Sequence, residues 1–283
     1  MNQVLCDGGL ANRLNTLLTA LVVKKYTQSA WGIAWPLNNW CGAPFEDLFE
    51  SMLPVSQKSL SYFKSQQDRY WQVFHENQIG FEESRITYNK TIADIGGLCN
   101  LVRVHPRIVY FHHAIPSYIT DEMLGEVIQD LRPVARVVNT VSEIVNQYGI
   151  TSDTIGVHIR KTDFGAAVDE NTLFDQIYGQ SEKFFICSDS NEVLEKFAEL
   201  KNCVSLPKPS MPKKLDEKGG WNSFVVDADG RNYPFNVDRD GESVYWALVD
   251  LLILSRTKIM MTSGSSFLNL ARRMGRTRYG FEV

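Results

Sequence analysis

Short apolar segments alternate with longer segments of helical periodicity along most of this 283-residue sequence, and this alternation constrains the fold more than any other feature. In the second half, the pattern predicts strands at residues 154–160, 183–187, 203–206 and 258–261, and helices at 170–179, 191–200, 241–255 and 265–274. In the first half it predicts strands at 3–6, 30–35 and 108–111, and helices at 10–26, 121–131 and 133–148, the last with Pro133 in its first turn. Strands that alternate with helices of this length predict an α/β fold with doubly wound parallel sheets.

Two stretches depart from the pattern, and they guide the division into domains. The pattern is weak between residues 36 and 107 and absent between 207 and 240. A chain of this length favours one large or two modest domains, so we expect an N-terminal α/β half at 1–150 and a Rossmann-like half at 151–283. The 207–240 segment either serves a site or is an inserted surface loop, and the sequence leaves both open.

Composition excludes several classes of protein. The formal net charge is −4, so the basic excess of a typical nucleic-acid-binding protein is missing, and we expect no nucleic-acid partner. No apolar run approaches the ~18 residues of a membrane helix. No basic and apolar leader precedes the first strand, and the five scattered cysteines suit reduced thiols. These features predict a cytoplasmic protein without a transmembrane segment.

The first candidate site is the sequence DGGLANR at residues 7–13, between the first strand and the first helix. Glycines allow close approach of a ligand to the backbone, and the amides of a helix start attract an anion. Asn12 and Arg13 would add an amide and a guanidinium at the mouth of the site. The GxGxxG and GxxxxGK[ST] patterns are absent, and an ordinary turn with Asn12 as N-cap is the alternative.

The second candidate is HIRKTD at residues 158–163, at the end of the 154–160 strand. Strand alternation would direct His158 and Arg160 to the same side of the sheet. The planar fork of an arginine suits two phosphate oxygens. The alternative is a surface ion pair between Arg160 and Asp163, which would contribute little.

The third candidate is TSGSSF at residues 262–267, between a strand and a helix. Serine hydroxyls and free amides at a helix start form a second anion site, whereas helix capping would account for only one serine. Asp227 and Asp229 mimic a metal-binding DxD motif, but Gly230 follows directly and favours a plain turn. We therefore expect no metal site.

Together, these motifs resemble the inverting fucosyltransferases of the GT-B type, which comprise the protein O-fucosyltransferases, the α-1,6-fucosyltransferases and the nodulation fucosyltransferases. Residues 8–13 are similar to the N-terminal glycine loop of the family, and 158–163 to its HxRxxD block. The helix containing Asp250 is similar to one whose aspartate reads guanine. Ser265, Ser266 and Phe267 resemble the last phosphate-binding block, and Asp189 falls where relatives have a Ser/Thr-Asp pair.

The resemblance implies a GT-B-like fold, with two Rossmann-like halves and a donor cleft between them. Residues 1–150 would then be the acceptor side and 151–283 the nucleotide-sugar half. It further implies transfer of fucose from GDP-fucose to a glycan or other hydroxyl acceptor, with inversion and without a metal or other cofactor. The implied donor-binding residues are Gly9, Asn12, Arg13, His158, Arg160, Asp189, Asp250, Ser265, Ser266 and Phe267.

The catalytic candidates are Arg160, Asp163 and Asp7. Arg160 would meet the negative charge that develops on the leaving diphosphate. Asp163 or Asp7 would accept the proton of the acceptor hydroxyl. Three alternatives stay open: a non-catalytic nucleotide-sugar or anion-binding protein, a glycosyltransferase with another nucleotide sugar, and a different nucleotide-using enzyme such as a sulfotransferase. A kinase is disfavoured because no phosphate loop with a lysine and metal ligands is visible.

Overall fold

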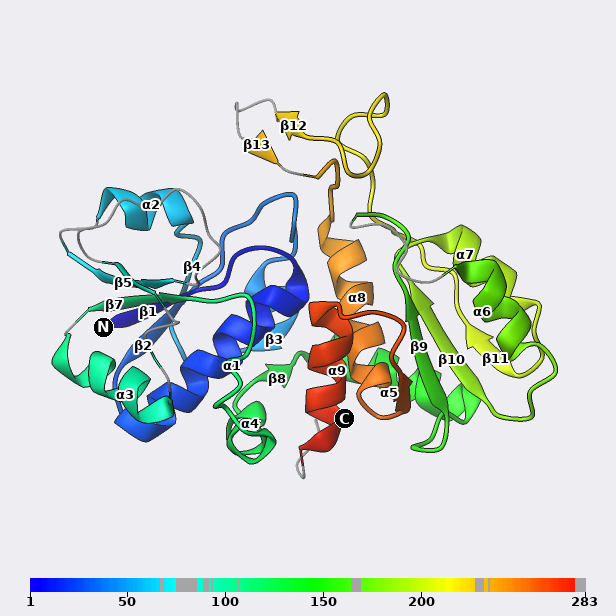
Figure 1. Ribbon diagram of the computed structural model, residues 1–283, viewed down its shortest axis with the longest axis horizontal. Helices are drawn as coiled ribbons and strands as arrows, with labels where there is room; N and C mark the ends of the chain where they lie inside the picture. The colour runs from blue at the N-terminus through cyan, green and yellow to red at the C-terminus, as the bar shows by residue number, and fades with distance from the viewer. Residues whose placement is uncertain are drawn as a thin grey trace. The chain divides into compact units, whose positions relative to one another are not determined.

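A computed structural model of the chain describes residues 1–66, 69–74, 86–88, 92, 94–105, 107–163, 169–226, 232–233 and 235–277. The chain forms two compact units. The bulk of the first unit is Met1–Leu37 and Pro44–Val134, and the bulk of the second is Asn38–Ala43 and Ala135–Gly275. Figure 1 shows the elements of each unit.

The first unit contains a six-stranded parallel sheet in the order β4-β2-β1-β7-β5-β6. Its strands are β1 (Asn2–Leu5), β2 (Trp31–Ala34), β4 (Val55–Ser56), β5 (Trp71–Phe74), β6 (Ile86–Tyr88) and β7 (Ile108–Phe111). All four residues of β1, β2 and β7 are buried. Strands that are buried on both faces of a parallel sheet are expected to be continuously apolar, as β7 is.

Helices cover both faces of this sheet (Figure 1). The helices of this unit are α1 (Leu10–Thr27), α2 (Leu60–Ser65), α3 (Ile95–Val104) and α4 (Asp121–Ile128), with a short 3₁₀ helix, η1 (Phe45–Asp47). Phe63 of α2 is fully buried against Leu5, Val109 and Phe111 of the sheet. The helices α1, α3 and α4 lie together on the opposite face (Figure 1).

The second unit contains a four-stranded parallel sheet in the order β11-β10-β9-β14. Its strands are β9 (Ile155–Ile159), β10 (Phe184–Ser188), β11 (Cys203–Ser205) and β14 (Lys258–Met260), and its helices are α5 (Ala135–Tyr148), α6 (Glu170–Ile177), α7 (Asn191–Ala198), α8 (Gly241–Leu254) and α9 (Ser266–Arg276). This is the strand and helix order that the sequence predicts for residues 154–274, with bounds that differ by no more than a few residues.

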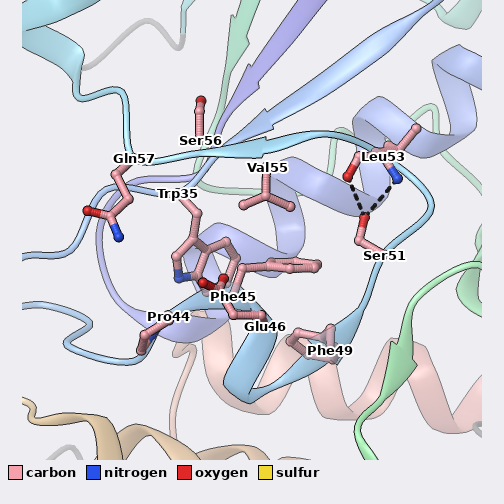
Figure 2. A pocket seen from close by; sticks show the side chains of 10 residues that line it. All are labelled: Trp35, Pro44, Phe45, Glu46, Phe49, Ser51, Leu53, Val55, Ser56 and Gln57. Carbon is pink, nitrogen blue, oxygen red and sulfur yellow. Dashed lines mark hydrogen bonds between the residues drawn. The ribbon is translucent and has the colours of Figure 1, made fainter.

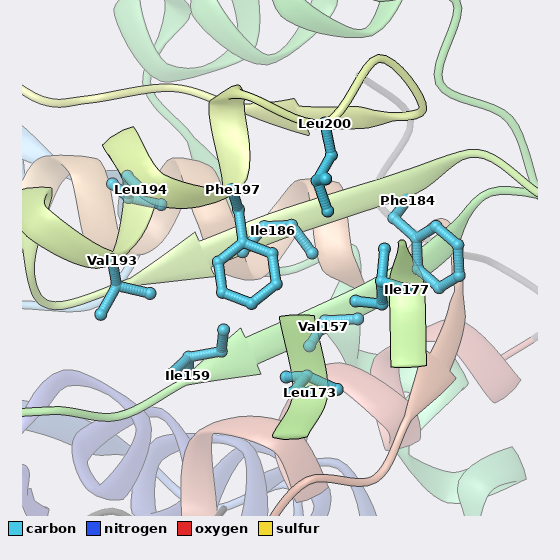
Figure 3. Close-up of a cluster of buried hydrophobic side chains, with 10 residues drawn as sticks. All are labelled: Val157, Ile159, Leu173, Ile177, Phe184, Ile186, Val193, Leu194, Phe197 and Leu200. Atoms are coloured by element: carbon cyan, nitrogen blue, oxygen red, sulfur yellow. The ribbon is translucent and has the colours of Figure 1, made fainter. Parts of the chain in front are cut away.

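The core of this unit lies between the sheet and the helices α6 and α7 (Figure 3). Val157 and Ile186 project from neighbouring strands towards Leu173 of α6 and Phe197 of α7. These side chains are 2% exposed or less, and each such burial contributes about 1.5–3 kcal/mol to stability. On β9, a side chain at Gly156 would come within 2.1 Å of Thr257 Oγ1 and 2.8 Å of Leu254 Cδ2, so the side chains at and after the end of α8 pack closely against the strand at this glycine.

Two small antiparallel sheets complete the described chain. They are β3 (Phe49–Glu50) with β8 (Arg132–Pro133), and β12 (Val225–Val226) with β13 (Asn232–Tyr233). The expectation that Pro133 opens a helix is wrong, because Pro133 pairs with Phe49 and α5 begins at Ala135. A two-residue edge strand tolerates proline because little hydrogen bonding is lost there.

Strand order places two of the motifs at one point of the second sheet. The chain runs from β9 to β10 and β11 on one side, and later returns to β14 on the other side of β9. The strand order therefore reverses at β9, and the loops after β9 and β14 lie side by side at this point. Open α/β sheets bind ligands at such switch points. In the first unit, the turn after β1 lies at the equivalent point between β2 and β7.

Candidate functional site

The loop after β9 is built around the buried carboxylate of Asp163. Arg160 donates to Asp163 Oδ1 from Nε at 3.0 Å and from Nη2 at 2.6 Å. Arg239, from the segment before α8, donates to the same oxygen from Nη2 at 2.8 Å. The side chain of Asp163 is 0% exposed, whereas those of Arg160 and Arg239 are 24% and 16% exposed. The ion pair between Arg160 and Asp163 thus forms, but it is partly buried and includes a second arginine.

These contacts argue against Asp163 as the general base. Burial by itself would raise the pKa of Asp163, but the charges and hydrogen bonds of Arg239 and Arg160 outweigh burial and leave that pKa below its ordinary value. A carboxylate with a lowered pKa is a weak proton acceptor. The contacts instead suit Asp163 to orienting the two arginines.

Asp189, which follows β10, fixes the backbone of the same loop. Its Oδ1 accepts a hydrogen bond from the backbone N–H of Lys161 at 2.7 Å, and its Oδ2 accepts from the hydroxyl of Thr162. The Nζ of Lys161 pairs with Glu170 at 2.6 Å. Asp189 therefore supports the loop that carries Arg160, and its donor-binding role stays a prediction.

His158 lies against the start of α9. Its ring stacks on Phe267, with centroids 4.7 Å apart, and its carbonyl accepts from Thr262 Oγ1 at 2.6 Å. Burial, together with repulsion from Arg160 and Lys208, lowers the pKa of His158 to about 4, against an opposing effect of Asp189. The imidazole is therefore neutral at pH 7, and its Nδ1 is buried without a hydrogen-bond partner among the described residues. The second and third motifs thus meet at the switch point.

The serines before α9 are partly used in capping. Ser265 Oγ accepts from the backbone N–H of Leu268 at 3.3 Å, and Ser263 Oγ accepts from that of Ser265 at 3.4 Å. Ser266 is the first residue of the helix. A side chain at Gly264 would meet no atom within 4 Å, so the backbone before α9 borders open space. The arrangement suits an anion at this helix start, although capping accounts for Ser265.

Asp250, on α8, forms a buried ion pair with Lys208, a residue that we did not predict. Burial raises the pKa of Asp250, and the charge and hydrogen bond of Lys208 oppose that rise. The backbone of Lys208 is itself fixed, because its N–H donates to Asn191 Oδ1 at 2.9 Å and its carbonyl accepts from Asn191 Nδ2 at 2.8 Å. The beginning of the 207–240 segment is therefore attached to α7 and to α8.

Arg239 was also missed from the sequence. Both Lys208 and Arg239 lie in the stretch without periodicity, where nothing distinguishes them from surface cations. Asp227 and Asp229 lie outside the described residues, so the DxD interpretation stays untested there. Among the residues that the structure describes, no cluster of His, Cys, Asp and Glu could hold a metal ion.

In the first unit, the turn after β1 requires glycine at one position. Gly8 has φ +82°, and a side chain there would lie 3.1 Å from His113 Nε2. Gly9 is the N-cap of α1, so the alternative of Asn12 as N-cap is wrong. No side chain caps α1 at Gly9, and a side chain at Gly9 would meet no atom within 4 Å. The helix start thus borders open space, as an anion site would.

Arg13 does not lie at the mouth of this turn as predicted. Its side chain is 0% exposed; Nε donates to the carbonyl of Gly8 at 2.6 Å and Nη1 to that of Pro36 at 2.8 Å. Its guanidinium also lies 4.9 Å from the ring centroid of Trp35. Arg13 therefore stabilises the glycine turn. Asp7 accepts from the backbone N–H of Gly8 at 2.7 Å and keeps a side chain that is 22% exposed.

A pocket of about 540 Å³ lies beyond the ends of β2 and β4 in the first unit (Figure 2). Trp35, Phe45 and Phe49 lie on its apolar side, and Glu46 and Gln57 are exposed at its rim. The other lining residues are Pro44, Ser51, Leu53, Val55 and Ser56. The pocket thus combines aromatic groups with polar groups at the carboxyl edge of the sheet.

Known structures share this fold. The crystal structure of fucosyltransferase NodZ from Bradyrhizobium matches 95% of this chain and 91% of its own, with a TM-score of 0.56 and 16% sequence identity. The structure of NodZ alpha-1,6-fucosyltransferase soaked with GDP-fucose matches 96% of this chain and 91% of its own, with a TM-score of 0.58 and 16% identity. No protein-family model and no curated protein sequence matches the chain.

The chain therefore has a fucosyltransferase-like fold, and the predicted α/β, GT-B-like fold class is confirmed. In the described part of the chain, none of the helices combines the length and the apolar character that crossing a bilayer requires.

Proposed function

We propose that this protein is a glycosyltransferase that transfers fucose from GDP-fucose to a glycan or another hydroxyl acceptor, with inversion and without a metal ion. The observation that supports this most is the meeting of Arg160, the His158–Phe267 stack and the start of α9 at the switch point of the second sheet. The fold of NodZ, whose structures were obtained with GDP and with GDP-fucose, adds support.

The proposed mechanism follows from the charges of the reaction. As the glycosidic bond breaks, positive charge develops on the sugar and negative charge on the leaving diphosphate. Arg160 and the amides at the start of α9 are preorganised donors for that negative charge, and preorganised donors of this kind lower the barrier. Asp7 is the remaining candidate for the base, since Asp163 is buried between two arginines.

The other roles in this proposal concern recognition. Asp250 would accept hydrogen bonds from N1–H and the exocyclic amine of guanine, and neutral His158 and Phe267 would contact the nucleoside. Gly9, Asn12, Ser265 and Ser266 are proposed donor contacts through amides and hydroxyls. We assign the acceptor to the first unit, where the pocket beside Phe45 offers aromatic and polar groups together.

A ligand panel tests the proposal. In a thermal-shift assay, GDP and GDP-fucose are expected to raise the melting temperature more than UDP, CDP and ADP do. Equal stabilisation by UDP or ADP would contradict the guanine assignment. Hydrolysis of GDP-fucose without an acceptor separates an enzyme from a non-catalytic nucleotide-sugar-binding protein, because only an enzyme releases GDP.

A further inference from the structure

Two guanidinium groups converge on one oxygen atom in the second unit. The Nη2 atoms of Arg160 and Arg239 lie 2.6 Å and 2.8 Å from Asp163 Oδ1. The two nitrogen atoms are therefore no farther apart than the sum of these distances, which a single diphosphate group spans. Like charges repel, and the carboxylate between the two guanidinium groups offsets that repulsion.

The backbone of Arg239 is fixed from two sides. Its N–H donates to the carbonyl of Asn39 at 2.9 Å, and its carbonyl accepts from the N–H of Gly42 at 2.8 Å. A side chain at Gly42 would come within 2.8 Å of that carbonyl, so only glycine allows this approach. Arg239 is thus held in place independently of its ion pair, as a preorganised binding residue requires.

The carboxylate of Asp163 does not cover the two guanidinium groups that it aligns. The Oδ2 atom of Asp163 is buried with no hydrogen-bond partner among the described residues. Both arginine side chains keep part of their surface exposed. An anion that reached them from solvent could contact both guanidinium groups, and charge-assisted bonds to arginine are strong when they are bidentate.

Asp240, the acidic residue that follows Arg239, has other partners. Asp240 caps α8, because its Oδ1 accepts from the N–H of Ser243 at 2.8 Å, and both of its oxygens accept from Ser210 Oγ at 2.9 Å. Its Oδ2 also lies 3.7 Å from Lys213 Nζ. Burial and the charge of Asp240 raise the pKa of Asp238, against opposing effects of Lys213 and Arg239.

We propose that Arg239 is a second diphosphate-binding residue, which acts together with Arg160, and that Asp163 is the positioning residue that aligns the two. This inference rests on the proposed function, because the diphosphate is that of the GDP-sugar donor. Arg239 lies outside the three sequence motifs, so the inference adds a donor contact that those motifs do not predict. The negative charge of the leaving diphosphate would then be met by two guanidinium groups rather than by one.

Calorimetric titration of GDP and of guanosine tests the inference with wild-type protein, Arg239→Gln and Arg239→Lys. We expect Arg239→Gln to weaken GDP binding about 10- to 100-fold, the usual cost of a lost hydrogen bond to a charged group, and to leave guanosine binding unchanged. Lysine keeps the charge and loses the fork, so Arg239→Lys is expected to fold with its pair to Asp163 and to bind GDP about 10-fold more weakly. If Arg239→Gln does not fold, Arg239→Lys carries the test.

Arg136→Gln is the matched control, since Arg136 also pairs with a carboxylate in this unit, Glu242 at 2.9 Å, but is 64% exposed. It is expected to bind GDP like the wild type. If the wild type binds GDP and both Arg239 variants bind it equally well, Arg239 is only structural and the inference is overturned, while the proposed function stands. Equal weakening of GDP and guanosine would also overturn it. A wild-type protein that binds no GDP overturns the proposed function and this inference with it.

Discussion

The ammonium of Lys208 and the carboxylate of Asp250 form an ion pair inside the second unit, with side chains 6% and 10% exposed. A buried pair of this kind is weak evidence for stability, because desolvation offsets much of the attraction. Its effect on the ionisation of Asp250 is more specific. Burial raises the pKa of Asp250 and Lys208 opposes that rise, so Lys208 favours the charged carboxylate that guanine recognition would use.

Lys208→Met is expected to make GDP binding depend on pH. Without the ammonium, only burial acts on Asp250, so its pKa rises further and the carboxyl is protonated over a wider range of pH. A protonated carboxyl cannot accept from both donors of guanine, so GDP affinity in this variant should fall as the pH is lowered and recover as the pH is raised and the proton is lost. Calorimetric titration of GDP at several pH values measures the change. Lys208→Arg, which keeps the charge, should remain near the wild type, and a pH-independent loss in Lys208→Met would refute the explanation.

Asp250→Asn is expected to reduce selectivity for guanine. The amide keeps the shape of the side chain but offers one acceptor atom where the carboxylate offers two, so one guanine donor is left unpaired. GDP should bind at least about 10-fold more weakly, since a lost hydrogen bond to a charged group costs about 1.5–3 kcal/mol. Competition titrations against ADP and UDP measure the change, and unchanged GDP affinity would return Asp250 to a purely structural role with Lys208.

Arg160→Lys and Arg160→Ala are both expected to lose about 10²–10³ in turnover while remaining folded. The contact to the leaving group strengthens as charge develops, so the loss in kcat should exceed the loss in GDP affinity. Steady-state kinetics with GDP-fucose, together with GDP titration, separate the two effects. If Arg160→Lys keeps near-normal activity, Arg160 only holds the loop through Asp163.

Transfer is expected to survive removal of metal ions. The proposed site meets the diphosphate with guanidinium groups and amides, so EDTA should leave both kcat and GDP affinity unchanged within about a factor of two. The measurement compares protein treated with EDTA before and after addition of Mn²⁺ or Mg²⁺. Strict dependence on either ion would favour Asp227 and Asp229 as ligands.

Gln57→Trp is expected to raise the KM for the acceptor without changing GDP affinity. The larger side chain would fill the rim of the pocket beside Glu46 and exclude an acceptor from it. Met52→Trp is the control, because Met52 is 99% exposed and does not line the pocket. Equal acceptor KM values in Gln57→Trp and in the wild type would place the acceptor elsewhere.

Periodicity was sufficient to predict most of the second unit, because the strands β9 and β10 and the helices α6 and α7 each bury a face whose spacing is visible locally. The 36–107 stretch could not be predicted in the same way. Its strands β3 and β4 are two residues long and depend on partners distant in sequence, as Phe49 depends on Pro133. The β-propensity of single residues carries almost no information about which residues pair across two such short strands.

A residue of the candidate site could be proposed from the sequence where it directly follows a strand, but not where it lies in a stretch without periodicity. Arg160 and Asp189 each follow a strand of the sheet, and the structure links both to the same loop. Lys208 and Arg239 reach that neighbourhood from the 207–240 segment, through contacts that no periodic pattern encodes. For Arg13 the sequence was misleading. Its place beside a glycine turn suggested a ligand contact, but its side chain is buried in the protein.

The short stretch from Asn38 to Ala43 belongs to the second unit although it lies far upstream in the chain. A fragment that begins at Ala135 would therefore lack Asn39 and Gly42, the two residues whose backbones fix Arg239. Such a fragment, expressed alone or transplanted onto another protein, would keep every motif recognised in its sequence and still lose part of the support for the proposed diphosphate site. The second unit is therefore not one contiguous piece of the chain, and gene fusions or domain exchanges should include residues 38–43 together with the rest of it.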